Sequence, residues 1–391
     1  MKMKLTNSLL LGGMALLFVG GMMLSSCEGP MGPPGTDGKD GVDGVDGTDG
    51  TDGVDGNVTC LVCHNTETKD AIASEFARSQ HSSGAIAVDY AGGRTDCAQC
   101  HSHEGYLEFA RTGEVAEDIT NPSQWQCRTC HDLHTTFEEG DYAFRLGDPV
   151  ALVANETVVI DGGNNNTCIN CHQARRNAAS YDNATEDKTY TSKFTDPADI
   201  AEYTSAAVGP AGSITLDQSG ATDTLVVVFD VPVATNAYIS SSHAGAHHGP
   251  QANVWAGKEA GVVDGDAYAP HAAGCVACHM GPATGHSFHV AEANCAECHS
   301  AAKLPGLDAT AARLEDIAAA LAAENAVHID AEWESGDPLF GAVEPKLASL
   351  DRDIFNAWWD FMLLVEDRSN GAHNPTYVNT LLTGIETALG L

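Results

Sequence analysis

Six copies of the pattern Cys-x-x-Cys-His constrain this chain more than any other feature of its sequence. They contain twelve of the thirteen cysteines. On one turn of chain, two cysteines three residues apart can form thioethers with the two vinyl groups of one haem, and the adjoining histidine can bind the iron. The sequence therefore predicts six covalently bound haem c groups.

Other sites also use closely spaced cysteines, among them zinc sites, thioredoxin-like redox centres and structural disulfides. None of these requires a histidine directly after the second cysteine. Histidine accounts for 17 of the 391 residues, so six such neighbours by chance have a probability of (17/391)⁶, on the order of 10⁻⁸. Haem is therefore the interpretation that accounts for the histidines.

The predicted cofactor-binding residues follow directly from the six motifs. The thioether cysteines are Cys60, Cys63, Cys97, Cys100, Cys127, Cys130, Cys168, Cys171, Cys275, Cys278, Cys295 and Cys298. The proximal iron ligands are His64, His101, His131, His172, His279 and His299. No side chain is assigned a catalytic role.

Each iron also needs a sixth ligand or an open position. After the predicted signal segment the chain holds only Met31, Met280 and Met362, so methionine cannot serve six irons. Eleven of the 17 histidines lie outside the motifs (17 − 6). Histidine on both faces of each haem is therefore expected, and this ligation gives lower reduction potentials than histidine with methionine.

The sequence around the motifs resembles that of multihaem cytochromes that bacteria export as lipoproteins. The similar segments are Phe76–His81, Cys127–His131 with His134–Phe137, Asn166–Arg175, His247–Gln251, His271 before Cys275, and Gly285–Phe288. Asp367–Pro375 resembles a C-terminal element shared with nitrite-reductase-like cytochromes, where the histidine is a distal ligand. The resemblance extends over most of residues 60–391 and is weakest around 200–240.

This resemblance implies six distal iron ligands, and it leaves open which haem each one serves. They are His81, His134, His247, His271, His286 and His373. His243 and His248 are the alternatives to His247, and His103 could serve a neighbouring haem. His289 and His328 are expected to face solvent.

Residues 1–26 form a predicted lipoprotein signal peptide. Lys2 and Lys4 precede an apolar run, and Leu24-Ser25-Ser26-Cys27 resembles a bacterial lipobox with lipid attached to Cys27. An ordinary signal peptide or an uncleaved anchor helix is the alternative. Since Cys27 is the only cysteine outside the haem motifs, lipidation is favoured. No other apolar stretch is long enough to span a bilayer, so the lipid is the only predicted membrane contact.

Residues 27–56 form a predicted spacer after the lipidated cysteine. Glycine recurs at every third position from Gly29 to Gly56, which is the collagen pattern. Pro33 and Pro34 support a short trimeric stalk, which would make the protein an oligomer. The later triplets are Gly-Val-Asp and Gly-Thr-Asp, so an extended acidic spacer is favoured.

The predicted fold class is mainly α and irregular, with the haems as the core. About 335 residues (391 − 56) follow the spacer for six haems, which leaves little chain for a separate hydrophobic core. The expected parts are a four-haem segment, an insert with short strands, a two-haem segment and a helical C-terminal segment. Their bounds are 57–180, 181–240, 241–305 and 306–391.

Three stretches carry secondary-structure signals outside the motifs. The β-branched run at residues 224–231 predicts a strand that pairs with residues 213–216, giving a small β insert over 213–232. Apolar residues at helical spacing predict helices over Asp308–Ala326 and Leu350–Asp367.

The formal net charge of −35 argues against nucleic acid as a partner, because phosphate binding needs clustered Lys and Arg. We expect a hexahaem electron relay at or outside the bacterial cell envelope, lipid-anchored to the outer membrane or cell surface. Its expected partners are other redox proteins or extracellular electron acceptors.

The alternative is a reductase of nitrogen or sulfur oxyanions. It needs one haem with an open coordination position beside cationic groups. Arg175 and Arg176 are the only adjacent basic pair, and pairing with haem propionates is the favoured role for them.

Overall fold

The chain was analysed as a computed structural model, which describes a defined set of residues. These are residues 60–61, 63–134, 142–205, 209, 213–247, 249–258, 270–300, 305–330, 333 and 343–391. The predicted signal peptide, Cys27, the spacer and the alternative ligand His248 lie outside the described residues. The described residues all belong to one compact unit, Asp55–Leu391.

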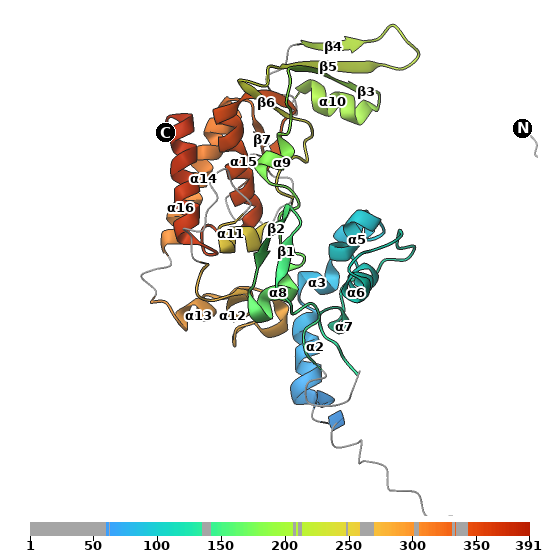
Figure 1. Cartoon of the computed structure of the whole chain (residues 1–391), viewed down its shortest axis with the longest axis vertical. Coiled ribbons are helices and arrows are strands. Elements are labelled where there is room, and N and C mark those ends of the chain that lie inside the picture. The colour runs from blue at the N-terminus through green and yellow to red at the C-terminus, as the bar shows by residue number, and fades with distance from the viewer. Residues whose placement is uncertain are drawn as a thin grey trace, which may run out of the picture. The chain divides into compact units, whose positions relative to one another are not determined.

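Short helices make up the described part of residues 60–134 (Figure 1). They are η1 (Thr66–Asp70), α2 (Ala71–Phe76), α3 (Gln80–Ser83), α4 (Ala85–Ala87), η2 (Val88–Gly92), α5 (Thr95–His101), α6 (His103–Thr112) and α7 (Cys127–Cys130). Polar caps define several ends: Ser79 Oγ accepts from Ser82 N at 3.1 Å, and Ser102 Oγ accepts from Gly105 N at 3.1 Å. The buried apolar side chains described in this segment are Val88, Ala91, Ala98 and Tyr106.

Nine strands form four small antiparallel sheets in the described residues. The pairs are β1 (Val150–Leu152) with β2 (Asn155–Ile160), β6 (Asn236–Ile239) with β9 (Ala348–Asp351), and β7 (Val327–Ile329) with β8 (Val343–Pro345). The three-stranded sheet has the order β3 (Lys188–Phe194), β5 (Thr224–Val231), β4 (Ser213–Asp217). The fold is therefore mixed helix and sheet. The expectation of a mainly α fold with one β insert is wrong because it underestimates the number of sheets.

The insert agrees with its predicted strands and contains one more. β5 covers the predicted run, and β4 pairs with it so that Leu216 lies opposite Leu225. β3, which the sequence did not predict, pairs with the other edge of β5. Alternate residues of β5, including Leu225 and Phe229, are fully buried against α10 (Pro197–Ser205). The insert thus has a small hydrophobic core of its own.

Single-turn helices fill much of the remaining described chain. They are η3 (Gly163–Asn165), α8 (Asn166–Ile169), α9 (Ala178–Tyr181), α11 (Gln251–Ala256), α12 (Cys275–His279), η4 (Gly285–Ser287) and α13 (Glu292–Ala296). No helix among the described residues has the length and apolar character needed to cross a membrane.

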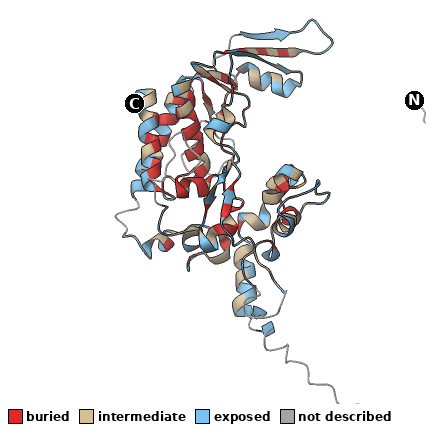
Figure 2. Ribbon diagram, viewed as in Figure 1, coloured by how far each residue is buried: buried red, intermediate tan, exposed pale blue. Residues whose placement is uncertain are grey.

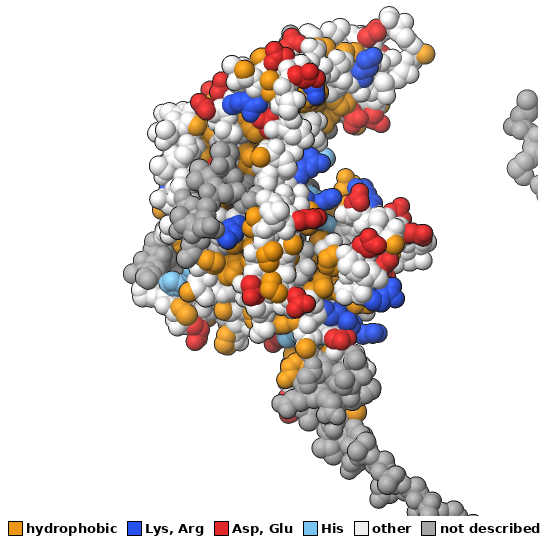
Figure 3. Space-filling model, viewed as in Figure 1, with side chains coloured by type: hydrophobic (Ala, Val, Ile, Leu, Met, Phe, Trp, Pro, Cys, Tyr) orange, Lys and Arg blue, Asp and Glu red, His pale blue; other side chains and the backbone are white. Residues whose placement is uncertain are grey.

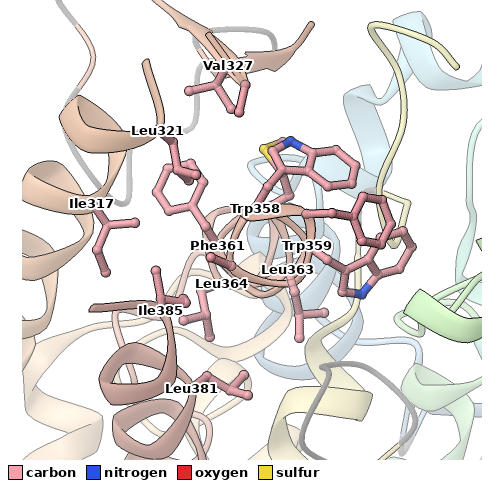
Figure 4. Packing of buried hydrophobic residues seen from close by; sticks show 14 of the residues in the cluster. Ile317, Leu321, Val327, Trp358, Trp359, Phe361, Leu363, Leu364, Leu381 and Ile385 are labelled. Carbon is pink, nitrogen blue, oxygen red and sulfur yellow. The ribbon is translucent and has the colours of Figure 1, made fainter. Parts of the chain in front are cut away.

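Three longer helices end the chain: α14 (Pro305–Ala323), α15 (Arg352–Asp367) and α16 (Pro375–Leu389). The first two overlap the predicted helices, and α16 was not predicted. They lie side by side and hold most of the buried residues drawn in red (Figures 1 and 2). Figure 4 shows side chains of α15 directed at Ile317 and Leu321 of α14 and at Leu381 and Ile385 of α16.

These helices form a hydrophobic core from their own apolar side chains. Trp358, Trp359 and Phe361 on α15 are all 0 % exposed. Arg313 of α14 also donates to both carboxylate oxygens of Glu386 on α16, at 2.6 and 2.8 Å. The expectation that little chain is left for a separate core is therefore wrong for this segment, because its helices bury their apolar faces against one another.

We expect Ile385→Ala to destabilise the protein by about 2–5 kcal/mol, because it opens a cavity between packed helices. Ile385 is 1 % exposed, whereas Ile86 is 88 % exposed, so Ile86→Ala is the matched control and should change stability by less than about 0.5 kcal/mol. Denaturant unfolding followed by far-ultraviolet circular dichroism measures both. Equal effects of the two substitutions would contradict the assigned core.

Candidate functional site

Each Cys-x-x-Cys-His motif occupies about one helical turn. The backbone N–H of the motif histidine donates to the first cysteine's carbonyl in His64 (2.7 Å), His131 (3.0 Å), His172 (2.9 Å) and His299 (2.8 Å). The other two motifs end the helices α5 and α12. Because residues i, i+3 and i+4 share one helix face, this turn brings both thiols and the imidazole to the same side. We number the motifs in chain order as sites 1 to 6.

Every motif histidine faces one histidine from outside the motifs. The pairs, with the distance between ring centroids, are His64 with His134 (5.9 Å), His101 with His247 (6.2 Å), His131 with His286 (6.3 Å), His172 with His81 (6.0 Å), His279 with His373 (6.3 Å) and His299 with His271 (5.9 Å). The six partners are the six predicted distal ligands. The structure thus places each of them beside one motif histidine, a pairing that the sequence left open, and their role as iron ligands stays a prediction.

The separation of the rings fits one metal ion between them. Two metal–imidazole bonds of about 2 Å each, together with the ring halves on either side of the metal, span about 6 Å. Other ring contacts of the described residues include separations of 4.9 Å for His131 and Phe144 and 6.4 Å for Phe76 and Phe288, so the spacing is compatible with a metal ion and does not by itself require one. The donor set at each site, two imidazoles beside two cysteines, matches covalently held haem iron. That these residues bind haem stays a prediction at this point.

The remaining described histidines do not face a motif histidine. His103 Nδ1 bonds Thr129 Oγ1 at 2.7 Å, His289 Nε2 donates to the Arg78 carbonyl at 3.2 Å, and His328 Nε2 lies 3.5 Å from Asp330 Oδ1. His243, the described alternative to His247, has no ring contact with a motif histidine among the described residues.

Hydrogen bonds fix the orientation of several paired rings through Nδ1. The acceptors are Tyr142 O for His131 (2.6 Å), Gln251 Oε1 for His172 (3.2 Å), Ala273 O for His271 (3.2 Å), Phe288 O for His279 (2.9 Å) and Asp367 Oδ1 for His373 (2.6 Å). An acceptor at Nδ1 keeps the proton there and leaves the Nε2 lone pair for a metal. Neither Gln251 nor Asp367 was predicted to orient a ligand histidine, although both lie in segments that resemble those of multihaem cytochromes.

Burial favours the neutral form of five of these imidazoles by lowering the pKa of each. It lowers the pKa of His81 to about 4, with the nearby His172 and His279 adding to the effect. Burial also lowers the pKa of His101, His172, His279 and His286. Burial acts in the same direction on His373, but the Asp367 carboxylate outweighs it and raises that pKa. A neutral imidazole has the lone pair that metal binding requires.

None of the described cysteines forms a disulfide. Thiols of different sites approach one another: Cys100 hydrogen bonds Cys171, which lowers the pKa of Cys100 and raises that of Cys171. A bond between Cys168 and Cys275 likewise lowers the pKa of Cys275 to about 7 and raises that of Cys168. Among the described residues, no three His, Cys, Asp or Glu side chains are grouped to hold a metal ion.

Arg175 and Arg176 do not point at a common site. Arg175 Nη1 lies 4.0 Å from Cys97 Sγ, whereas the Arg176 guanidinium lies over the Tyr181 ring at 5.8 Å from its centroid. The two cations therefore do not converge as an anion pocket would require.

Comparisons with known proteins give one distant structural neighbour. No protein-family model and no curated protein matches the chain. A solved structure named as an undecaheme cytochrome from the S-layer of Carboxydothermus ferrireducens aligns with 80% of this chain at 17% identity and a TM-score of 0.41. The chain spans 40% of the length of that structure.

Proposed function

We propose that the protein is a hexahaem c-type cytochrome that relays electrons. One observation carries the proposal: six of six motif histidines face a second histidine at 5.9–6.3 Å between ring centroids. The chemistry of Cys-x-x-Cys-His supports covalent attachment, and the ring spacing supports histidine on both faces of each iron.

The residues of the chain would hold and tune the cofactors. Haem supplies one-electron chemistry at its iron when bound. The paired cysteines would fix each porphyrin, and the two imidazoles would fill both axial positions. Carbonyl and carboxylate acceptors at Nδ1 would hold the rings in place and raise their basicity, as Asp367 would for His373 at 2.6 Å.

The same pairing favours a relay over a reductase. A reductase of oxyanions needs an open position on one iron, with cationic groups beside it. Each motif histidine has a histidine partner, and Arg175 and Arg176 diverge. Nothing in this arrangement favours substrate binding at iron.

The proposal places the relay at the cell envelope, with redox proteins or extracellular electron acceptors as partners. The support comes from sequence: the lipobox-like Leu24–Cys27 and the Gly-x-y spacer up to Gly56. An acidic surface also suits an exported, soluble domain. Figure 3 shows acidic side chains spread over much of the described surface of the face it draws, with Lys and Arg among them.

We expect six haems per chain, all low-spin in the ferric state, because in our proposal two imidazoles would bind each iron. Intact mass and electron paramagnetic resonance of the purified holoprotein test this. A stoichiometric high-spin signal that shifts with nitrite, hydroxylamine or sulfite would favour the reductase instead. A mass lacking six haems would refute the proposal itself.

We expect His373→Ala to convert one haem of the six to high-spin, since it removes the partner of His279. His328→Ala is the matched control, because His328 lies near Asp330 rather than a motif histidine, and it should leave all six low-spin. Spin quantitation measures the change. Identical spectra for the two variants would remove His373 from the ligand set.

We expect Asp367→Asn to raise the reduction potential of one haem, because the carboxylate makes His373 a stronger donor to ferric iron. A tenfold loss of preference for the ferric form corresponds to about 59 mV for one electron. Asp353→Asn, an exposed change on the same helix, is the control and should shift no potential. Spectroelectrochemical titration separates the outcomes, and equal shifts would count against the assigned role of Asp367.

A further inference from the structure

We infer that the six sites form one row in the order 1–3–4–5–6, with site 2 branching from site 4. The inference rests on the proposed function, because the sites are named by the haems they would hold. It goes beyond that function by fixing which haem passes electrons to which. The motifs do not follow this order along the chain, so the sequence alone does not give it.

Site 4 is central because the segment that carries it contacts two other sites. Cys100 Sγ of site 2 lies 3.7 Å from the carbonyl of Asn170, which stands between the two cysteines of site 4. Val276 N of site 5 donates at 3.0 Å to Oδ1 of Asn165, three residues before the first cysteine of site 4. Haems attached to segments in direct contact must themselves be neighbours.

Phe288 contacts histidines of sites 3, 4 and 5. Its carbonyl accepts from His279 of site 5, at 2.9 Å. Its ring lies 5.0 Å from His81 of site 4 and 6.1 Å from His286 of site 3. Phe288 has φ of 58°, an uncommon conformation for a non-glycine residue, and it is part of the arrangement that places these three contacts together.

Sites 1 and 6 each join the row at one end. His134, the partner of site 1, stands three residues after His131 of site 3, so their Cα atoms lie within about 11 Å. At the other end, Asn294, directly before the first cysteine of site 6, donates from Nδ2 to the Cys278 carbonyl of site 5 at 2.8 Å. His271, the partner of site 6, also stands four residues before site 5.

Exposure agrees with the end of the row at site 1. Both cysteines of site 1 are exposed, whereas sites 3 and 6 have one exposed cysteine each, Cys127 and Cys298. The six cysteines of sites 2, 4 and 5 are only partly exposed. Electron exchange with a partner is therefore assigned to site 1, where a donor or acceptor can approach the haem most closely.

The iron positions in an experimental structure of the holoprotein test the order directly. We expect the irons of sites 2 and 5 among the nearest neighbours of the site 4 iron, and the irons of sites 1 and 6 to be the most widely separated pair of the main row. Six irons in another order would overturn this inference and leave the proposed function intact. Fewer than six irons would overturn both.

A pair of phenylalanine variants tests the central contacts in solution. Phe288→Leu should change the low-spin g values of two of the six haems, because the ring contacts His81 of site 4 and His286 of site 3, whereas the Phe288 carbonyl that accepts from His279 is retained. Phe144→Leu is the matched control: Phe144 stacks on His131 alone among the described ring contacts, so one haem should change. A change confined to one haem in Phe288→Leu would contradict the placement of Phe288 between sites 3 and 4. A count of six haems in both variants would show that the cofactors remain.

Discussion

The arrangement of the six motifs depends on pairs of imidazole rings that lie about 6 Å apart. Several of these pairs join distant parts of the chain: His131 and His286 are 155 positions apart (286 − 131), and His101 and His247 are 146 apart (247 − 101). Closing such loops costs conformational entropy. A metal ion that binds both rings offsets this cost, so in our proposal cofactor binding supplies folding free energy to segments with few buried apolar side chains, such as residues 60–134.

In the C-terminal helices, hydrophobic burial offsets the loss of conformational entropy. These helices also contact residues of the proposed haem sites. The last turn of α15 holds Asp367, which accepts from His373. The neighbouring Glu366 carbonyl accepts from Gln251 Nε2 at 3.3 Å, and Gln251 Oε1 in turn contacts His172. A packed helix can hold ligands more precisely than a loop. The hydrophobic core therefore positions one histidine of site 4 and one of site 5.

What the sequence could predict follows from how local each interaction is. The motifs can be predicted because one helical turn suffices to place two thiols and an imidazole. The β-branched run predicts β5, and the short distance along the chain between β4 and β5 predicts their pairing. β6 and β9 are four residues each and come from segments over 100 positions apart, so no local pattern predicts their pairing. The assignment of His247 to site 2 is long-range in the same way, and only the folded chain provides it.

The negative charge of the chain and the proposed ligation of each haem iron by two histidines both lower the reduction potentials of the haems. Two imidazoles stabilise ferric iron more than imidazole with methionine does. A net charge of −35 also opposes the addition of each electron, and burial of the sites weakens the screening of that charge by solvent. The proposed relay would therefore operate at low potential. It would accept electrons only from strong reductants and could pass them to acceptors that a histidine–methionine cytochrome would reduce poorly.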